Sequence, residues 1–318
     1  MRLCIVRRIF LFAILVLAAR PLQAQGLLAR ADNLLRVGRM FAAETLYYYA
    51  VRRAPRDPEA RLALGRYLAA RGALRIGAVL MEEARYFGAD PKKVAAHLAP
   101  IYAQLGDFRA LAGLPNTPLH NAERARAEWL RDHAPKTDGP DSVSIHFTPA
   151  DTGILGTVAV RVGREIVQAV IDPLAHGVVL DTVWMRSKET KVFASKFDND
   201  VRNAAGVTLE IGFGELSMHR VVTSFAPQPS PARAVIGLDV LMPFAPTIDA
   251  AGRRILLRKR GRVDGDMPGE RVQTLVLGSG LWIVWEEAMV PLASERGRQL
   301  LADGAWTLDW RRGQLVAH

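Results

Sequence analysis

The pattern of apolar positions divides the chain into a helical part and a strand-forming part. Over residues 26–113, apolar side chains recur with a period of about 3.6 residues, as expected for amphipathic helices. Gly38, Gly72 and Gly106 interrupt this pattern at intervals of 34 residues. A fixed period of this length with a glycine turn in each unit predicts stacked helical hairpins, because one hairpin alone cannot bury its apolar face.

The boundaries between the predicted hairpins are marked by an Asp-Pro pair. Asp57-Pro58 is followed 33 residues later by Asp90-Pro91. The second hairpin resembles the first-helix pattern of tetratricopeptide repeats at four positions: Leu64, Gly65, Tyr67 and Gly72. The resemblance covers residues 26–113 and implies a concave groove that binds a peptide or a partner protein. A helical cap that only orients the next domain is the alternative.

From residue 141 the apolar positions alternate, which is typical of half-buried strands. A short helix is predicted over residues 238–244, and a last hairpin is predicted to turn at Gly252. Many short strands at this spacing predict a small antiparallel β domain or barrel over residues 141–261. The other predicted strands cover residues 158–162, 165–171, 178–180, 207–213 and 216–225.

Two further segments have a different composition. Residues 114–140 contain four prolines around a polar helix candidate at 121–132, which predicts an interdomain linker. Residues 262–318 form a C-terminal α/β extension of unknown role. This extension has two predicted strands, one predicted helix and one predicted hairpin: 272–277, 281–285, 292–303 and 306–318. The fold class expected for the whole chain is α+β multidomain, with a helical-hairpin array before an antiparallel β domain.

The N-terminus has the order of a secretory signal. Basic residues precede an uncharged apolar run over residues 9–19, and residues 22–24 resemble a cleavage site. This order predicts a signal peptide over residues 1–24 and a secreted or periplasmic mature protein. No stable membrane span is expected after cleavage, since spanning takes roughly twenty apolar residues. An uncleaved N-terminal membrane anchor is the alternative.

Composition excludes some chemistry. Cys4 is the only cysteine and leaves with the predicted signal, so the mature chain is expected to have no disulfide and no cysteine nucleophile. The formal net charge of +10 is best explained by arginines on solvated faces. A partner with an anionic surface, such as membrane lipid or an acidic polymer, is the alternative. Basic residues do not cluster with aromatic residues along the sequence, so no nucleic-acid partner is expected.

Asp172 is the main candidate for catalysis. It ends the apolar run 168–171, and the segment 235–237, Val-Ile-Gly, later opens the predicted short helix. In this order the two segments resemble the retropepsin-like aspartic proteases, in which an apolar strand ends in Asp-Thr/Ser-Gly-Ala and two apolar residues with a glycine open a short helix. The resemblance covers residues 141–260. It implies a cleft lined by Pro173, Leu174, Ala175, His176, Gly177, Val235, Ile236 and Gly237.

Two departures from that family's motif concern its chemistry. Pro173 stands where the family has Thr or Ser, and it has neither a hydroxyl nor an N–H group. Leu174 stands where the family has Gly and adds an apolar branch. Aspartic proteolysis needs two carboxylates that share one proton, so a chain with one such Asp must form a homodimer through the β domain to be active. The resemblance therefore implies a degenerate site.

Other constellations are weak. Asp151-Thr152-Gly153 is a literal Asp-Thr-Gly triplet, but it follows Thr148-Pro149-Ala150 rather than an apolar strand, so Asp151 is only the second candidate. The seven histidines are scattered without the spacing of a helical metal site. No metal and no cofactor are expected.

Three functions follow from these observations. The leading one is an exported, retropepsin-like protein with a degenerate site that binds an extended peptide or partner protein without cleaving it. The second is an active homodimeric aspartic endopeptidase that uses Asp172. The third is a non-catalytic scaffold of the cell envelope.

Overall fold

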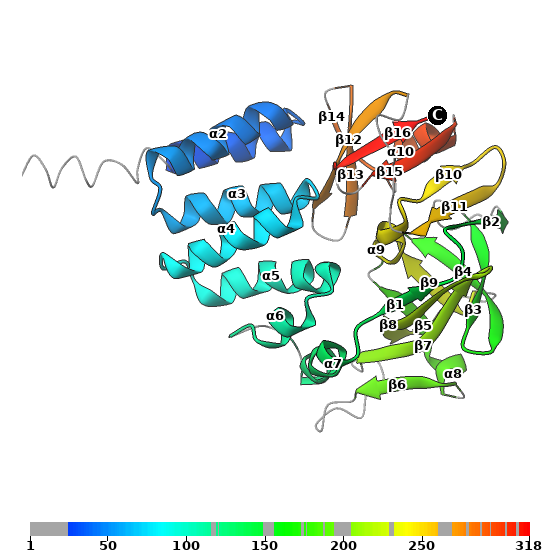
Figure 1. The fold of residues 1–318 in the computed structure, drawn as a ribbon. Coiled ribbons are helices and arrows are strands. Elements are labelled where there is room, and N and C mark those ends of the chain that lie inside the picture. Colours follow the sequence, from blue (N-terminus) through cyan, green and yellow to red (C-terminus); the bar gives the residue numbers. More distant parts are fainter. Residues whose placement is uncertain are drawn as a thin grey trace, which may run out of the picture.

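In the computed structural model the chain folds into a helical array followed by a β-rich region that contains a barrel (Figure 1). The structure describes residues 25–115, 119, 121–148, 156–172, 175, 177–186, 188–193, 205–228, 232–259, 269–277, 280–286, 288–292, 294–302, 304–309 and 312–318. The predicted signal peptide therefore lies outside the described residues. No helix in the described part of the chain is both long and apolar enough to span a membrane.

The array consists of helical hairpins, as the period of 34 residues predicts. Its helices are residues 25–36, α2 (Met40–Arg53), α3 (Pro58–Ala70), α4 (Leu74–Tyr86), α5 (Pro91–Leu105) and α6 (Phe108–Ala112). The two Asp-Pro pairs begin α3 and α5, where Asp57 accepts from the N–H groups of Glu59 and Ala60 and Asp90 accepts from that of Lys92. An acceptor at the N-cap followed by proline at the first helical position is a favoured helix start.

Two glycines let the helices of the second hairpin pack closely. A Cβ on Gly65 of α3 would lie 2.9 Å from the carbonyl oxygen of Gly77 of α4. A Cβ on Gly77 would lie 2.7 Å from the carbonyl oxygen of Gly65. Any side chain at either position would collide with the backbone of the other helix, so this close packing explains why both residues are glycine.

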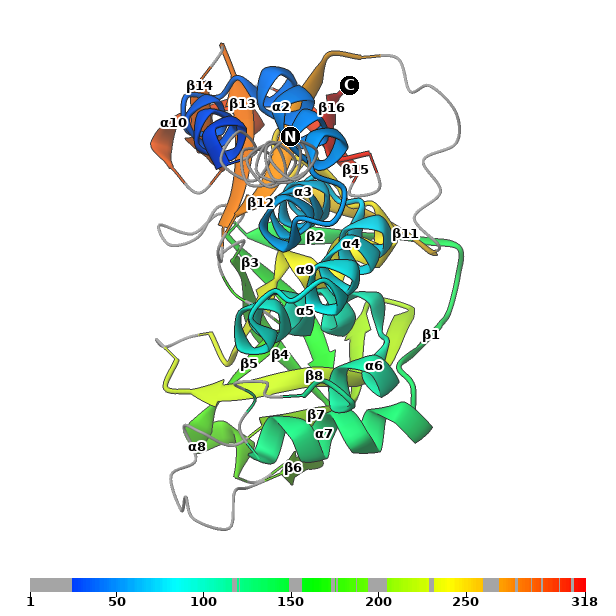
Figure 2. The same ribbon diagram turned by 90° about the vertical axis from the view of Figure 1, so that its left-hand side faces the viewer.

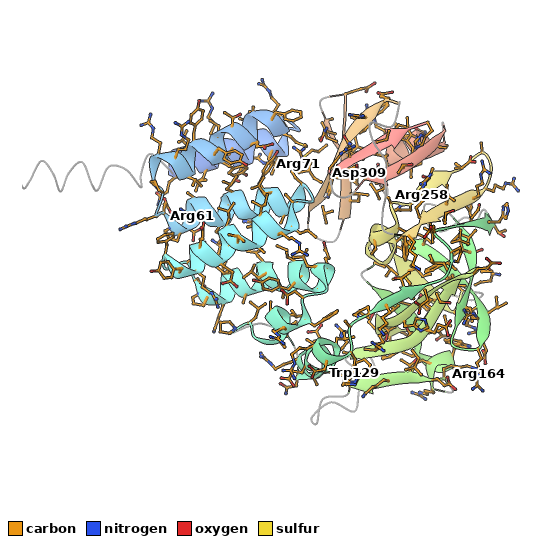
Figure 3. All side chains as sticks on the ribbon, in the orientation of Figure 1. Arg61, Arg71, Trp129, Arg164, Arg258 and Asp309 are labelled. Carbon is orange, nitrogen blue, oxygen red and sulfur yellow. The ribbon has the colours of Figure 1, made fainter. Side chains whose placement is uncertain are left out.

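The segment predicted as a linker contains regular structure. Helix α7 (Asn121–Asp132) buries Ala122, Ala127 and Leu130, and strand β1 (Lys136–Asp138) pairs with β8. The aromatic ring of Trp129 on α7 packs 6.1 Å from that of Phe193 on β6 (Figure 3). Residues 121–138 thus hold the array against the barrel, while the division of the chain into domains at this segment stays a prediction.

Six strands form a closed barrel. In the order of their pairing they are β3 (Thr157–Val162), β4 (Glu165–Asp172), β9 (Ala234–Gly237), β5 (Val178–Asp181), β8 (Leu216–Ala226) and β7 (Ala205–Phe213), and β7 pairs back with β3. Two of these pairings, β4–β9 and β5–β8, are parallel. The barrel is therefore mixed, whereas the alternating pattern predicts an antiparallel domain. Strand β6 (Thr190–Phe193) and helix α8 (Thr182–Met185) flank it.

The C-terminal extension continues the same sheet. Strand β2 (Ser142–Thr148) joins the barrel to β11 (Arg254–Arg258) and β10 (Thr247–Asp249), and β10 pairs with β15 (Ala305–Asp309). The sheet then runs through β16 (Gln314–Ala317), β12 (Arg271–Leu277), β13 (Gly280–Trp285) and β14 (Ala288–Pro291). Helix α10 (Glu295–Ala302) covers this part. The remaining short helices are α9 (Leu238–Leu241) and η2 (Met242–Phe244).

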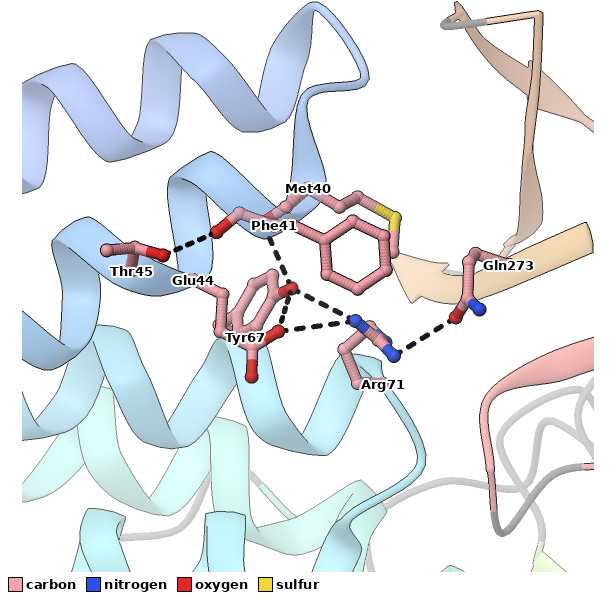
Figure 4. A network of polar contacts seen from close by, with 7 residues as sticks. All are labelled: Met40, Phe41, Glu44, Thr45, Tyr67, Arg71 and Gln273. Carbon is pink, nitrogen blue, oxygen red and sulfur yellow. Dashed lines mark hydrogen bonds and ion pairs between the residues drawn. The ribbon is translucent and has the colours of Figure 1, made fainter.

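The array and the C-terminal strands are joined by a polar network around Arg71 (Figures 3 and 4). The Arg71 guanidinium donates to Gln273 of β12 at 3.0 Å and approaches the Glu44 carboxylate of α2 at 3.4 Å. A Cβ on Gly313 would lie 2.4 Å from the carbonyl oxygen of Arg71. Next to this network, Leu275 and Trp282 pack into the apolar core of the first two hairpins. Polar and apolar contacts together fix the array on the extension.

Candidate functional site

Asp172 ends a strand in the part of the barrel where the order of the strands in the sheet departs from their order in the chain. Strands β4 and β5 are consecutive along the chain, yet β9 lies between them, parallel to β4 and antiparallel to β5. The register places Asp172 beside Gly237 at the carboxyl ends of β4 and β9. The side chains of Ile171 and Ile236 just before them are fully buried. Burial of both strands up to their last residues fixes where Asp172 leaves the barrel.

The connection from β4 to β5 is tied to the end of β9. The Ala175 N–H donates to the carbonyl oxygen of Asp172 at 3.2 Å, so the chain turns directly after the aspartate. The Gly237 N–H donates to the carbonyl oxygen of Gly177 at 2.8 Å. Gly177 has a φ of 66°, and a Cβ there would lie 3.0 Å from the carbonyl oxygen of Val222. Glycine is the residue that fits this backbone conformation without strain.

The predicted cleft residues are thus partly placed. The structure brings Asp172, Ala175 and Gly177 together with the end of β9, which carries Val235, Ile236 and Gly237. The side chain of Asp172 is half-buried. Pro173, Leu174, His176 and the alternative Asp151 lie outside the described residues. Their roles, and the roles of the whole set in a cleft, stay predictions.

An ion pair between a buried carboxylate and an exposed arginine, which the sequence analysis did not find, supports this arrangement of strands. Asp181 at the end of β5 is 4 % exposed and accepts from the Arg233 guanidinium at 2.9 Å. It also accepts from the N–H of Val183, which caps α8. The Asp181 N–H donates to the carbonyl oxygen of Arg233 at 2.9 Å, and the Arg233 N–H donates to that of Gln168. These bonds position β9 between its neighbours, and they give Asp181 a structural role.

The chemistry available at this loop depends on carboxylates. Aspartic proteolysis requires two carboxyl groups at one water, one of them neutral and one ionised. The crossing of β4, β9 and β5 places one such aspartate per chain. Among the described residues, no three histidine, cysteine, aspartate or glutamate side chains lie together as a metal site.

A second candidate site is a groove of about 620 Å³ along the helical array. The first helix of each hairpin supplies most of its lining: residues 25–36, α3 and α5, with Tyr47 of α2 and Leu74 and Met81 of α4 beside them. The wall is both apolar and polar, with Leu28, Leu62 and Ile101 beside Asp32 and Arg66. Val276 of the C-terminal extension closes one end. An open groove with mixed walls suits an extended segment that offers both backbone polar groups and apolar side chains.

The charged groups of the groove are unevenly compensated. Lys93 donates to the Glu59 carboxylate at 2.8 Å. Within the described residues, Arg66 makes no hydrogen bond and no ion pair, and its side chain is exposed. Burial, together with the positive charges of Arg66 and Lys93, lowers the pKa of His97. His97 therefore stays neutral in the groove to lower pH than a free imidazole.

Two tyrosines fix the upper part of the groove. The Tyr47 hydroxyl donates to Asp32. The Tyr67 hydroxyl donates to Glu44 at 3.0 Å, as Figure 4 shows. Burial raises the pKa of both hydroxyls above its ordinary value, so both remain donors. Apart from Tyr67, the sequence analysis did not single out these residues. The repeat interval could have indicated part of the groove, because its lining residues Asp32, Arg66 and Pro100 are each 34 residues apart in the sequence.

Comparisons with known proteins give partial likenesses. No family model and no curated protein sequence matches the chain. One similar solved structure is PcrH in complex with the chaperone binding region of PopD, at 22 % identity and a TM-score of 0.25, over 34 % of this chain and 88 % of that one. Another is a retropepsin-like aspartic protease from Rickettsia conorii, at 12 % identity and a TM-score of 0.27, over 40 % of this chain and 93 % of that one.

Proposed function

We propose that the chain is an exported protein that binds an extended peptide, or a segment of a partner protein, without cleaving it. The observation that carries the proposal is the groove of about 620 Å³ along the first helices of the array. Its walls offer apolar side chains, the amide of Gln104 and the exposed Arg66 guanidinium. An extended segment presents complementary groups: backbone carbonyls, acidic side chains and apolar side chains.

The Asp172 loop supports binding rather than hydrolysis. The aspartate keeps the backbone environment that its resemblance to the proteases implies, beside Gly237 at the ends of two parallel strands. Pro173 and Leu174 follow it in the sequence, and proline offers neither hydroxyl nor N–H to a neighbouring carboxylate.

Strand pairing gives a second argument against an active pair of chains. In the described sheet the terminal strands are β14 and β6, and β1 pairs only with β8. None of these three is a neighbour of β4. A second copy that extended the sheet would therefore add its strands away from Asp172. Two Asp172 side chains could meet only through contacts between loops.

Peptide capture tests the proposal. The immobilised protein is incubated with a pool of synthetic unstructured peptides, and the retained peptides are identified by mass spectrometry. Ala63→Phe places a large side chain in the groove and is expected to abolish retention, because Ala63 lines its wall. Thr45→Phe on the exposed part of α2 is the matched control and is expected to retain the peptides. Equal retention by both variants would contradict the assignment to the groove, and no retention by the wild type would favour a scaffold.

An active homodimeric endopeptidase is the second candidate, because the crossing of β4, β9 and β5 presents Asp172 at strand ends. It predicts a dimer by analytical ultracentrifugation and cleavage of unstructured protein at acid pH. A variant that no longer dimerises must also lose the cleavage activity. A monomeric protein that cleaves nothing would exclude this candidate.

Export belongs to the same proposal. The basic and apolar order of residues 1–24 predicts cleavage after Ala24. Intact-mass measurement of protein recovered from the periplasm should give the mass of residues 25–318. Recovery of the full-length mass in the membrane fraction would instead establish an N-terminal anchor.

A further inference from the structure

The outward side of the array exposes a concentration of large apolar side chains. Tyr86 is 84 % exposed and Phe41 is 65 % exposed. Most large apolar side chains that are exposed in the described part of the chain lie within residues 37–86: Val37, Phe41, Tyr48, Tyr49, Ile76, Val79 and Tyr86. Isolated apolar side chains on a surface are ordinary, but a concentration on one face indicates an interaction site.

These side chains lie mainly on two helices, α2 and α4. Phe41, Tyr48 and Tyr49 follow one another at helical spacing along α2, and Ile76, Val79 and Tyr86 do so along α4. Both helices are the second members of their hairpins, and they contribute Tyr47, Leu74 and Met81 to the groove. We call the six exposed residues the outer face. None of these six residues lines the groove.

Arginines surround the outer face without acidic partners. Arg39, Arg52 and Arg75 are exposed and, within the described residues, make no hydrogen bond or ion pair. The one acidic residue of α2, Glu44, is already bonded to Tyr67. The two acidic residues of α4 are also engaged, Glu83 by Arg61 and Glu82 by Tyr102. The outer face is therefore apolar and aromatic with three exposed arginines around it, and the exposed Asp107 lies beside Val79 and Tyr86 in the hollow between α4 and α5.

We propose that the outer face docks on a membrane surface that contains anionic lipid. Aromatic rings and short apolar side chains enter the boundary between headgroups and acyl chains, and arginines pair with lipid phosphates. Tyrosine suits this boundary because its ring is apolar and its hydroxyl stays hydrated. The net charge of +10 acts in the same direction. A second copy fits less well, because a two-fold contact would place these arginines near their own counterparts. Of the acidic residues in the hollow beside Val79 and Tyr86, Glu82 and Glu83 are already paired with Arg85 and Arg61, which leaves Asp107.

The inference does not depend on peptide binding in the groove. The six residues of the outer face are separate from the residues that line the groove, so docking through them does not use the groove's wall. Membrane docking by the outer face is also independent of the N-terminal apolar segment, and it would act whether or not that segment is removed.

A fluorescent label on the outer face tests the proposal. In a Cys4→Ser background, Tyr86→Cys is labelled with a nitrobenzoxadiazole dye, and Ile166→Cys on β4, 75 % exposed in the wild type, is the matched control. The labelled proteins are mixed with vesicles of phosphatidylcholine, with or without phosphatidylglycerol. We expect a blue shift and an increase in emission at position 86 only with phosphatidylglycerol, and no change at position 166. The readout holds even if residues 1–24 are retained.

Charge reversal supplies the quantitative arm. Arg52→Glu combined with Arg75→Glu should weaken partitioning at least tenfold, since each basic residue near an anionic surface contributes roughly a factor of five. Arg164→Glu combined with Arg186→Glu changes the net charge equally at exposed positions of the barrel region and should have little effect. An unchanged emission at position 86, an equal change at 166, or equal loss in both charge variants would overturn the proposal. A change at 86 that rises with protein concentration without vesicles would assign the face to a second copy.

Discussion

Replacing Gly177 with alanine probes the geometry of the Asp172 loop directly. Gly177 has a φ of 66°, which an L-residue adopts at a cost of about 1–2 kcal/mol. The new Cβ would also lie 3.0 Å from the carbonyl oxygen of Val222, so the loop or β8 must shift. A shift of Gly177 weakens the bond that its carbonyl accepts from the Gly237 N–H, which contributes about 0.5–1.5 kcal/mol. The expected destabilisation is about 2–3 kcal/mol.

Gly163 provides a matched control in the same barrel. Its φ is 61°, and no heavy atom lies within 4 Å of a Cβ built there. Gly163→Ala therefore carries only the conformational cost of about 1–2 kcal/mol. Calorimetry should show a fall in Tm of about 4–12 °C for Gly177→Ala and a smaller fall of about 2–8 °C for Gly163→Ala, since 1 kcal/mol corresponds to about 2–4 °C at this size. Equal falls, or a larger fall for Gly163→Ala, would refute the close contact between the Asp172 loop and β8.

Three other variants test separate parts of the structure. Asp181→Ala should lower stability by about 2–4 kcal/mol, because it removes both the helix cap and the partner of Arg233, whereas Asp181→Asn should cost less in urea unfolding. Arg71→Met should destabilise by about 1–2 kcal/mol and speed hydrogen exchange in β12, and an unchanged β12 would contradict the role of its bond to Gln273. Because the pKa of His97 is lowered from 6.5, the wild type should lose stability as pH falls below 6.5. His97→Gln should flatten that loss, and an identical pH dependence in both proteins would contradict it.

The strands that the sequence predicted well are those with a long alternation and a clear turn. Residues 158–162 and 207–213 alternate cleanly and fall within β3 and β7. Strands β6 and β14, each four residues long, were not predicted, because so short a segment carries almost no periodicity. The parallel pairing of β4 with β9 was also beyond the pattern, since alternation describes one strand and does not name its neighbour.

The candidate sites divide in a similar way. The resemblance to the aspartic proteases directed attention to Asp172 and to the segment ending at Gly237, and the structure places these two residues side by side. The groove was implied only as a general property of helical repeats. Its particular residues, such as Arg66 on α3 and His97 on α5, lie on separate helices and come together only in the fold, so no local motif marks them. The sequence did not predict the outer face for the same reason. Its aromatic residues and the arginines around it are separated along the sequence, and they belong to α2, α4 and the residue before α2.

The claim that this protein binds without cleaving is tested most directly at Asp172. Protein recovered after export is incubated with an unstructured protein substrate from acid to neutral pH, with and without pepstatin, and the products are identified by mass spectrometry beside Asp172→Asn. We expect the substrate to remain intact in every sample, with no difference between wild type and variant. Pepstatin-sensitive cleavage by the wild type that disappears in Asp172→Asn would contradict the account and establish an active aspartic protease.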